Sequence, residues 1–232
     1  MPAKSLQPVD LVAAEEARWR IQPIALRTPL LRLDVDADST EIWLKLENLQ
    51  PIRSFKLRGA ANSMLSVDGS RLRPGVWTAS AGNMAQGVAW CARYLGVDCT
   101  VAVPEGAPEA KLAAIRALGA DIVMVPYADW FGIYATCEYE GMRGTFVHAF
   151  DDPAVMAGNS TIALEILEDL PDVDAVVIPY GGGGLFCGIG AVLRQLRPQA
   201  RLYAAEVSTA APLAAAVEAG RPVDIDHQRS FR

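Results

Sequence analysis

The chain has 232 residues and a mass of 24.9 kDa; 51% of its residues are hydrophobic and 21% are charged, which describes a globular protein with a substantial core rather than a disordered chain. A formal charge of −6 without a dense Lys/Arg run excludes the usual basic footprint of a nucleic-acid-binding protein. No apolar run reaches the roughly 18–20 residues that span a bilayer.

The beginning of the chain and its cysteines indicate the compartment. The first ten residues, MPAKSLQPVD, lack the apolar stretch of a secretion signal. Cys91, Cys99, Cys137 and Cys187 form no CxxC pair and have no metal-like spacing with the two histidines. We therefore expect reduced thiols, no membrane segment and a cytoplasmic protein.

β-rich runs and helically spaced apolar residues alternate along the chain. An amphipathic helix is predicted around Arg18, Trp19 and Arg20. Strands are then predicted over residues 41–47, 75–79, 98–103, 121–125, 174–179 and 201–206. Between them, apolar stripes predict helices at Leu112/Ile115/Leu118 and Ile162/Ile166/Leu170, and Gly96 and Gly119 mark helix ends. This order predicts an α/β fold with a parallel sheet covered on both faces.

Ligands of such folds bind where strands turn into helices, so those turns are the candidate sites. One turn consists of four glycines, followed by a helix predicted to begin near Leu185. Consecutive N–H groups at a helix N-terminus bind anions, and glycine lets a phosphate approach the backbone. The sequence matches neither GxGxxG nor the P-loop pattern, which favours one small phosphate; a tight packing turn is the alternative.

A second candidate is Lys56, in the segment SFKLRGA. Lysines are usually solvated, but shelter by Phe55 and a nearby cationic Arg58 would disfavour the charged form and lower the pKa of this amine. A neutral amine suits Schiff-base chemistry. A nucleophilic lysine together with a phosphate cradle points to pyridoxal phosphate.

The third candidate is the SAGNMAQG segment, which also lies between a strand and a helix. Ser80 could cap that helix. Alternatively, its hydroxyl, the side chain of Asn83 and free N–H groups could bind a substrate carboxylate.

In this order, SFKLRGA, SAGNMAQG and GGGGL resemble the serine/threonine dehydratases among the fold-type II pyridoxal-phosphate enzymes, and the resemblance runs from LRTPL at Leu26 to the C-terminus. It implies the two-lobed, three-layer parallel-sheet architecture of the tryptophan synthase β-like enzymes. The large lobe would comprise residues 1–71 and 146–232, and the small inserted lobe residues 72–145. Family members continue past residue 232, so this chain would lack a C-terminal part of the large lobe, including the group facing the pyridine nitrogen. Exposed sheet edges would then favour a homo-oligomer.

The resemblance also implies roles for single residues. Lys56 would form the Schiff base with the cofactor and later take the α-proton of the substrate. The other expected cofactor contacts are Phe55 on the ring, Asn83 on the phenolic oxygen, Gly181, Gly182, Gly183, Gly184 and Leu185 around the phosphate, and Glu206 near the site. The substrate carboxylate would be lined by Ser80, Ala81, Gly82, Asn83 and Gln86. We expect no metal, because no second carboxylate follows Glu206. His148, Asp151 and Asp152 would be structural, and Trp130 and Tyr134 would serve packing.

The implied reaction is β-elimination of L-threonine or L-serine to a 2-oxo acid and ammonia. Related racemases have a second serine where this chain has Ala81, and alanine has no proton to give, which favours elimination over racemisation. Two alternatives stay open: a non-catalytic relative that acts as a binding or interaction protein, and a dehydratase for another β-hydroxy amino acid such as 3-hydroxyaspartate.

Overall fold

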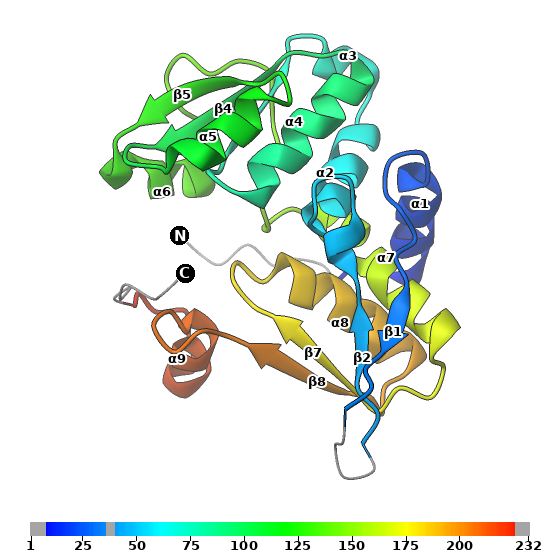
Figure 1. The fold of residues 1–232 in the computed structure, drawn as a ribbon. Coiled ribbons are helices and arrows are strands. Elements are labelled where there is room, and N and C mark those ends of the chain that lie inside the picture. Colours follow the sequence, from blue (N-terminus) through cyan, green and yellow to red (C-terminus); the bar gives the residue numbers. More distant parts are fainter. Residues whose placement is uncertain (1–7, 36–39, 226–232) are drawn as a thin grey trace.

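A computed structural model describes residues 8–35 and 40–225 (Figure 1). The helices are α1 (Leu11–Ile21), the short 3-10 helix η1 (Glu47–Leu49), α2 (Lys56–Leu65), α3 (Gly69–Leu72), α4 (Asn83–Leu95), α5 (Glu109–Arg116), α6 (Tyr127–Thr136), α7 (Pro153–Asp169), α8 (Gly184–Leu196) and α9 (Pro212–Ala219). The strands are β1 (Leu30–Arg32), β2 (Trp43–Lys45), β3 (Val76–Ala79), β4 (Cys99–Pro104), β5 (Asp121–Val125), β6 (Thr145–Phe146), β7 (Ala175–Pro179) and β8 (Arg201–Ala205). Within the described ranges, no helix is long and apolar enough to cross a membrane.

One lobe is built on a four-stranded parallel sheet in the order β5-β4-β3-β6. Neighbouring residues of β3 point to opposite faces, so Val76 joins one core with α4 and α5 while Trp77 joins another with α6. β3 is buried along its whole length. This is the predicted parallel sheet with helices on both faces.

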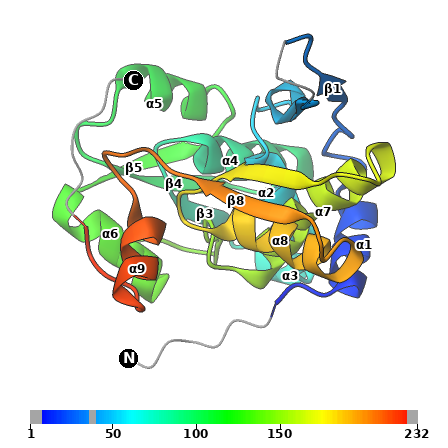
Figure 2. The ribbon, with the colours of Figure 1, turned by 90° about the horizontal axis from the view of Figure 1, so that it is seen from below.

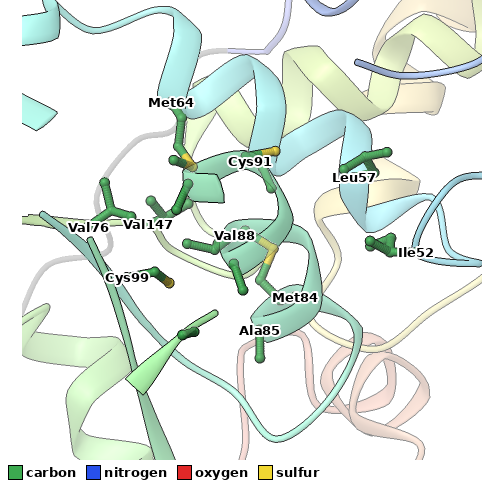
Figure 3. Close-up of a cluster of buried hydrophobic side chains, with 14 of the residues drawn as sticks. Ile52, Leu57, Met64, Val76, Met84, Ala85, Val88, Cys91, Cys99 and Val147 are labelled. Carbon is green, nitrogen blue, oxygen red and sulfur yellow. The ribbon is translucent and has the colours of Figure 1, made fainter. Parts of the chain in front are cut away.

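The core on the α4 side extends beyond the sheet. Figure 3 shows Met84 and Val88 of α4 among side chains from the sheet and from α2. Leu57 of α2 belongs to the same cluster and is fully buried. The helix that begins at Lys56 is therefore anchored to the sheet lobe by its apolar face.

The other lobe is centred on α7, which is buried from Val155 to Ile166. Glycines allow its close helix crossings: a Cβ at Gly158 would lie 2.3 Å from the Arg58 carbonyl oxygen, and one at Gly188 would lie 2.4 Å from the Met156 carbonyl oxygen. In Figure 1, α2 runs between the two lobes. Shifts of α7 would therefore be transmitted to α2.

Helix α8 packs on one face of the parallel pair β7-β8, and the other face has no described helix on it (Figure 2). Figure 2, seen from below, shows both strands with no described helix in front of them. Val177 and Tyr203 are cross-strand partners on that face and are 68% and 47% exposed. An apolar sheet face is thus open to solvent in the described part of the chain.

All six predicted strands are present, with ends shifted by up to two residues. The pattern did not predict β1 or β6, and it was wrong about the pairing of β2, which runs antiparallel to β1 instead of joining a parallel sheet. The lobe boundaries at 71/72 and 145/146 stay a prediction; the two residues of β6 lie on either side of the second boundary.

Candidate functional site

Lys56 is the first residue of α2, and its amine points toward the loop that follows β6. Its Nζ donates a hydrogen bond of 2.6 Å to the carbonyl oxygen of Ala149 and lies 5.3 Å from the ring centroid of Phe55. Burial lowers the pKa of this amine to about 8. A lysine with such a pKa is partly uncharged near neutral pH, as an amine nucleophile must be.

Arg58 does not contribute to this shift as the sequence suggested. Its guanidinium is only 1% exposed and pairs with Glu165 at 2.6 Å and Glu47 at 2.8 Å. These carboxylates balance its charge, and burial is what lowers the pKa of Lys56. The expected role of Arg58 is therefore wrong: it fastens α2 to α7 and to the segment before α2.

The glycine turn joins β7 to α8, and the helix begins at Gly184, one residue earlier than predicted. Gly183 has φ +86°, a conformation that favours glycine. Within the described chain, the backbone N–H groups of residues 181–186 find no acceptor. The open space beside Gly181 and this run of N–H groups make a cradle for an anion at the N-terminus of α8.

Residues 148–151 connect Lys56 with the glycine turn. Ala149 receives the amine, and the next residue, Phe150, packs against the turn. A Cβ at Gly182 would lie 2.3 Å from the Phe150 ring, and one at Gly184 would lie 2.6 Å from the Phe150 carbonyl oxygen. The structure therefore brings the lysine and the glycine turn to the same place.

Sequence reasoning missed Ala149 and Phe150 as parts of this site. The segment HAFDDP was noticed, but only structural roles were assigned within it. Asp152 does have such a role, because its carboxylate accepts from the N–H groups of Ala154 and Val155 and caps α7. The partner of Lys56 is the backbone carbonyl oxygen of Ala149, and because every residue has such a carbonyl, the sequence could not indicate this contact.

Residues 80–86 lie beside Lys56; they comprise the turn after β3 and the first residues of α4, and are called the 80–86 loop below. This loop follows β3, whose neighbour β6 leads into residues 148–151, and Thr78 Oγ1 donates to the Val147 carbonyl oxygen at 2.8 Å. One turn into α4, a Cβ at Gly87 would lie only 3.3 Å from the Lys56 carbonyl oxygen. The loop, the lysine and the glycine turn thus form one candidate site.

Within that loop, Ser80 does not cap α4. Its hydroxyl accepts from the N–H of Gly82 at 3.1 Å, and Gly82 is the residue that precedes the helix. No acceptor in the described chain pairs with the backbone N–H groups of residues 81 and 83–85. Asn83 is exposed, and neither it nor the half-buried Gln86 makes a side-chain hydrogen bond to described residues. These groups can receive a carboxylate.

One further predicted residue, Glu206, has partners outside the proposed cofactor site. Glu206 follows β8 next to the glycine turn, since the backbone N–H of Tyr180 donates to the Ala205 carbonyl oxygen at 2.8 Å. Its carboxylate accepts from the N–H groups of Leu213 and Ala214 at the start of α9. Among described residues, no group of three or more His, Cys, Asp or Glu side chains is placed to hold a metal.

Comparison with protein families then identifies the chain. The model of the pyridoxal-phosphate dependent enzymes matches residues 21–231. The chain belongs to this family. L-threonine ammonia-lyase from Geobacter sulfurreducens is 41% identical over 214 residues, which cover 91% of this chain and 53% of that protein.

Solved structures agree with the family at the level of the fold. The processed form of threonine deaminase isoform 2 from Solanum lycopersicum is 32% identical with a TM-score of 0.81, over 98% of this chain and 70% of that one. Maize serine racemase is 28% identical with a TM-score of 0.86, over 94% of this chain and 68% of that one. The fold is therefore that of the fold-type II pyridoxal-phosphate enzymes. The chain spans about half the length of the curated relatives it matches.

The residues present fit the family's cofactor. Pyridoxal phosphate needs an amine for its aldehyde and an anion cradle for its phosphate. Lys56, with a pKa of about 8, supplies the amine, and the N–H groups of residues 181–186, which have no acceptor in the described chain, supply the cradle. The two are joined through Ala149 and Phe150.

Proposed function

We propose that this chain binds pyridoxal 5′-phosphate and catalyses β-elimination of L-threonine or L-serine, giving a 2-oxo acid and ammonia. One observation carries the proposal: the Lys56 amine is held at the Ala149 carbonyl oxygen, one residue from the ring that packs on the glycine turn. The similarity to an L-threonine ammonia-lyase supports the choice of substrate.

Each loop has a proposed task. Gly181 to Gly184 and the N–H of Leu185 hold the cofactor phosphate, Phe55 packs on its ring and Asn83 donates to its phenolic oxygen. The carboxylate of the amino acid is bound by Ser80, Gly82, Asn83 and Gln86, with the backbone of Ala81. Glu206 closes the site beyond the glycine turn, through the α9 N-terminus that it caps.

Bound pyridoxal phosphate supplies an electron sink for charge that develops on the α-carbon. Lys56 takes the α-proton; its lowered pKa and its bond to the Ala149 carbonyl oxygen beside the glycine turn support this role. The β-hydroxyl takes up one proton as it leaves, so the α-proton and hydroxide are lost in sum as water, and hydrolysis of the released enamine off the enzyme then gives the 2-oxo acid and ammonia. Ala81 offers no proton on the opposite side of the α-carbon, so we propose elimination rather than racemisation.

We further propose a cytoplasmic homo-oligomer, a dimer or larger, with the lobes divided at 71/72 and 145/146. The exposed apolar face around Val177 and Tyr203 supports self-association. Cys91 and Cys99 are buried and burial raises the pKa of each thiol to about 12, as suits reduced cysteines.

The test combines absorbance with product formation. Purified protein mixed with pyridoxal phosphate should turn yellow, and borohydride should fix the cofactor on the peptide that contains Lys56. Lys56→Ala should abolish the band and the turnover, whereas Lys111→Ala, on α5, should leave both unchanged. Turnover that survives in Lys56→Ala would refute the assignment of the base.

A substrate panel separates the alternatives. L-threonine, L-serine and 3-hydroxyaspartate are compared by release of 2-oxo acid, and D-serine is measured as the product of racemisation. A yellow protein without turnover would favour a non-catalytic binding protein. A protein that stays colourless with the cofactor would overturn the proposal altogether.

A further inference from the structure

Tyr134 of α6 contacts both loops that flank the Lys56 amine. Its hydroxyl donates to the carbonyl oxygen of Ala79, the last residue of β3. Its own carbonyl oxygen lies 3.3 Å from Nε2 of His148, and its ring centroid is 5.3 Å from the His148 ring and 5.2 Å from the Phe150 ring. The proposed mechanism assigns this tyrosine nothing.

The hydroxyl holds the entrance to the 80–86 loop. Ala79 is directly followed by Ser80, and the N–H of Ser80 is fixed on the other side by the Ala102 carbonyl oxygen at 3.0 Å. Burial raises the pKa of the Tyr134 phenol, so the group remains a protonated donor at every pH at which the protein is handled. The start of the loop is thus fastened from β4 and from α6.

The ring and the carbonyl of Tyr134 hold the 148–151 loop. Nδ1 of His148 accepts from the N–H groups of Phe150 at 3.2 Å and Asp151 at 2.7 Å, so Nε2 carries the proton and donates to Tyr134. These bonds enclose Ala149, whose carbonyl receives the Lys56 amine. Phe150 lies between Tyr134 and the glycine turn, with its ring tilted by 38° to the Tyr134 ring, and completes the contact.

We propose that Tyr134 is a positioning residue of the site: its hydroxyl sets the 80–86 loop, and its ring and carbonyl set the 148–151 loop that orients the Lys56 amine. One side chain, that of Tyr134, would thereby set the distance between the 80–86 loop and the Lys56 amine. The expected effect on catalysis rests on the proposed function, whereas the ordering of the 80–86 loop and of the 148–151 loop by Tyr134 does not.

Two substitutions separate the two effects. Tyr134→Phe removes only the hydroxyl, and Tyr134→Leu removes the hydroxyl and the ring but keeps the backbone carbonyl. Phe131→Leu is the matched control, because Phe131 lies on the same helix, is half exposed and, within the described chain, contacts only Tyr127 and Trp130 among the aromatic rings. Circular dichroism and melting temperature establish that each variant is folded.

The first measurement uses cofactor-free protein and hydrogen–deuterium exchange read by mass spectrometry. In peptides covering 80–86, Tyr134→Phe should raise the exchange rate of the hydrogen-bonded amides of Ser80, Gly82 and Gln86 about fivefold, as expected for one lost hydrogen bond, with little change in 148–151. Tyr134→Leu should raise the rate about tenfold in both loops, because the ring contacts are lost as well. Phe131→Leu should change neither.

The second measurement is catalytic. In Tyr134→Phe, KM for L-threonine should rise about fivefold while kcat stays near wild type, since the hydroxyl sets the 80–86 loop and not the Lys56 amine. In Tyr134→Leu, pyridoxal phosphate should bind about tenfold more weakly. A merely structural tyrosine would lower the melting temperature without this division between KM and kcat.

The outcomes are distinguishable from a failure of the proposed function. If wild-type protein shows neither colour nor turnover, the proposed function fails, while the exchange data still decide the role of Tyr134. Unchanged exchange in 80–86 for Tyr134→Phe, or equal acceleration throughout the chain for Tyr134→Leu, would overturn the positioning role. Loop-specific exchange as described would support it.

Discussion

Gly158→Ala tests whether the contact between α2 and α7 sets the position of the lysine. An added Cβ at this residue would lie 2.3 Å from the carbonyl oxygen of Arg58 and 2.8 Å from the Cβ of Asn62, about 1 Å closer than ordinary van der Waals contact. The obstacle is backbone, so α2 must move away from α7. Overpacking costs about 1–3 kcal/mol, and a clash with backbone belongs at the upper end of that range. The alanine's helix propensity offsets up to about 1 kcal/mol, which leaves a net loss of about 2 kcal/mol.

Gly132→Ala supplies the matched control, because this glycine lies inside α6 and its added Cβ meets no described atom within 4 Å. We expect it to gain about 0.5–1 kcal/mol. Urea denaturation of both variants measures the free energy of unfolding, and titration with pyridoxal phosphate measures whether α2 has moved. A Gly158→Ala protein as stable as Gly132→Ala, with unchanged cofactor affinity, would refute the argument.

Three further predictions concern buried polar groups. In urea denaturation, Glu165→Gln should lower the free energy of unfolding by about 3 kcal/mol, because Arg58 and Lys45 then lack their buried carboxylate partner. Glu109→Gln, which breaks an exposed ion pair, should show no such loss in the same experiment. Asn159→Ala should leave the melting temperature unchanged or raise it, since neither amide atom of Asn159 has a hydrogen-bond partner among the described residues. Asn62→Ala loses hydrogen bonds to Arg20 and Ala154 and should lower the free energy of unfolding by about 1–2 kcal/mol. A greater loss of stability for Asn159→Ala than for Asn62→Ala would contradict this. The rate of acylation of Lys56, measured by peptide mass spectrometry, should rise with pH with a midpoint near pH 8, because the amine reacts only when uncharged. A midpoint near the pKa of lysine in a free peptide, about 10.4, would show that burial does not lower the pKa of this amine.

Much of the fold could be predicted because strands and helices leave local patterns. The strand over 121–125 was predicted with its observed bounds, and α4 and α5 end near the glycines that marked their ends. β6 has only two residues, which is too short to make a pattern of its own. The antiparallel pairing of β2 with β1 depends on register rather than on composition, so the sequence could not show it.

The sequence indicated the separate motifs of the candidate site, but not the contacts that join them. The lysine, the glycine turn and the 80–86 loop are each visible as a local sequence pattern, and the structure brings the three together. The partner of Lys56 is a backbone carbonyl, and the partner of Arg58 is Glu165 in another helix. Such contacts are decided by tertiary packing, which is why Arg58 was assigned to the wrong neighbour and why Tyr134 was interpreted as packing alone.

The long separation of the contacting loops has a consequence for biosynthesis. Lys56 and Ala149 are 93 residues apart in the chain, and they meet only after β6 has been placed beside β3. Bringing two such distant segments together requires closing the intervening chain into a loop. A nascent chain that ends before β6 lacks the carbonyl that receives the Lys56 amine and the strand that positions it. In such a chain the lysine is hydrated and has the pKa of an ordinary lysine, so the amine acquires its lowered pKa only through tertiary structure.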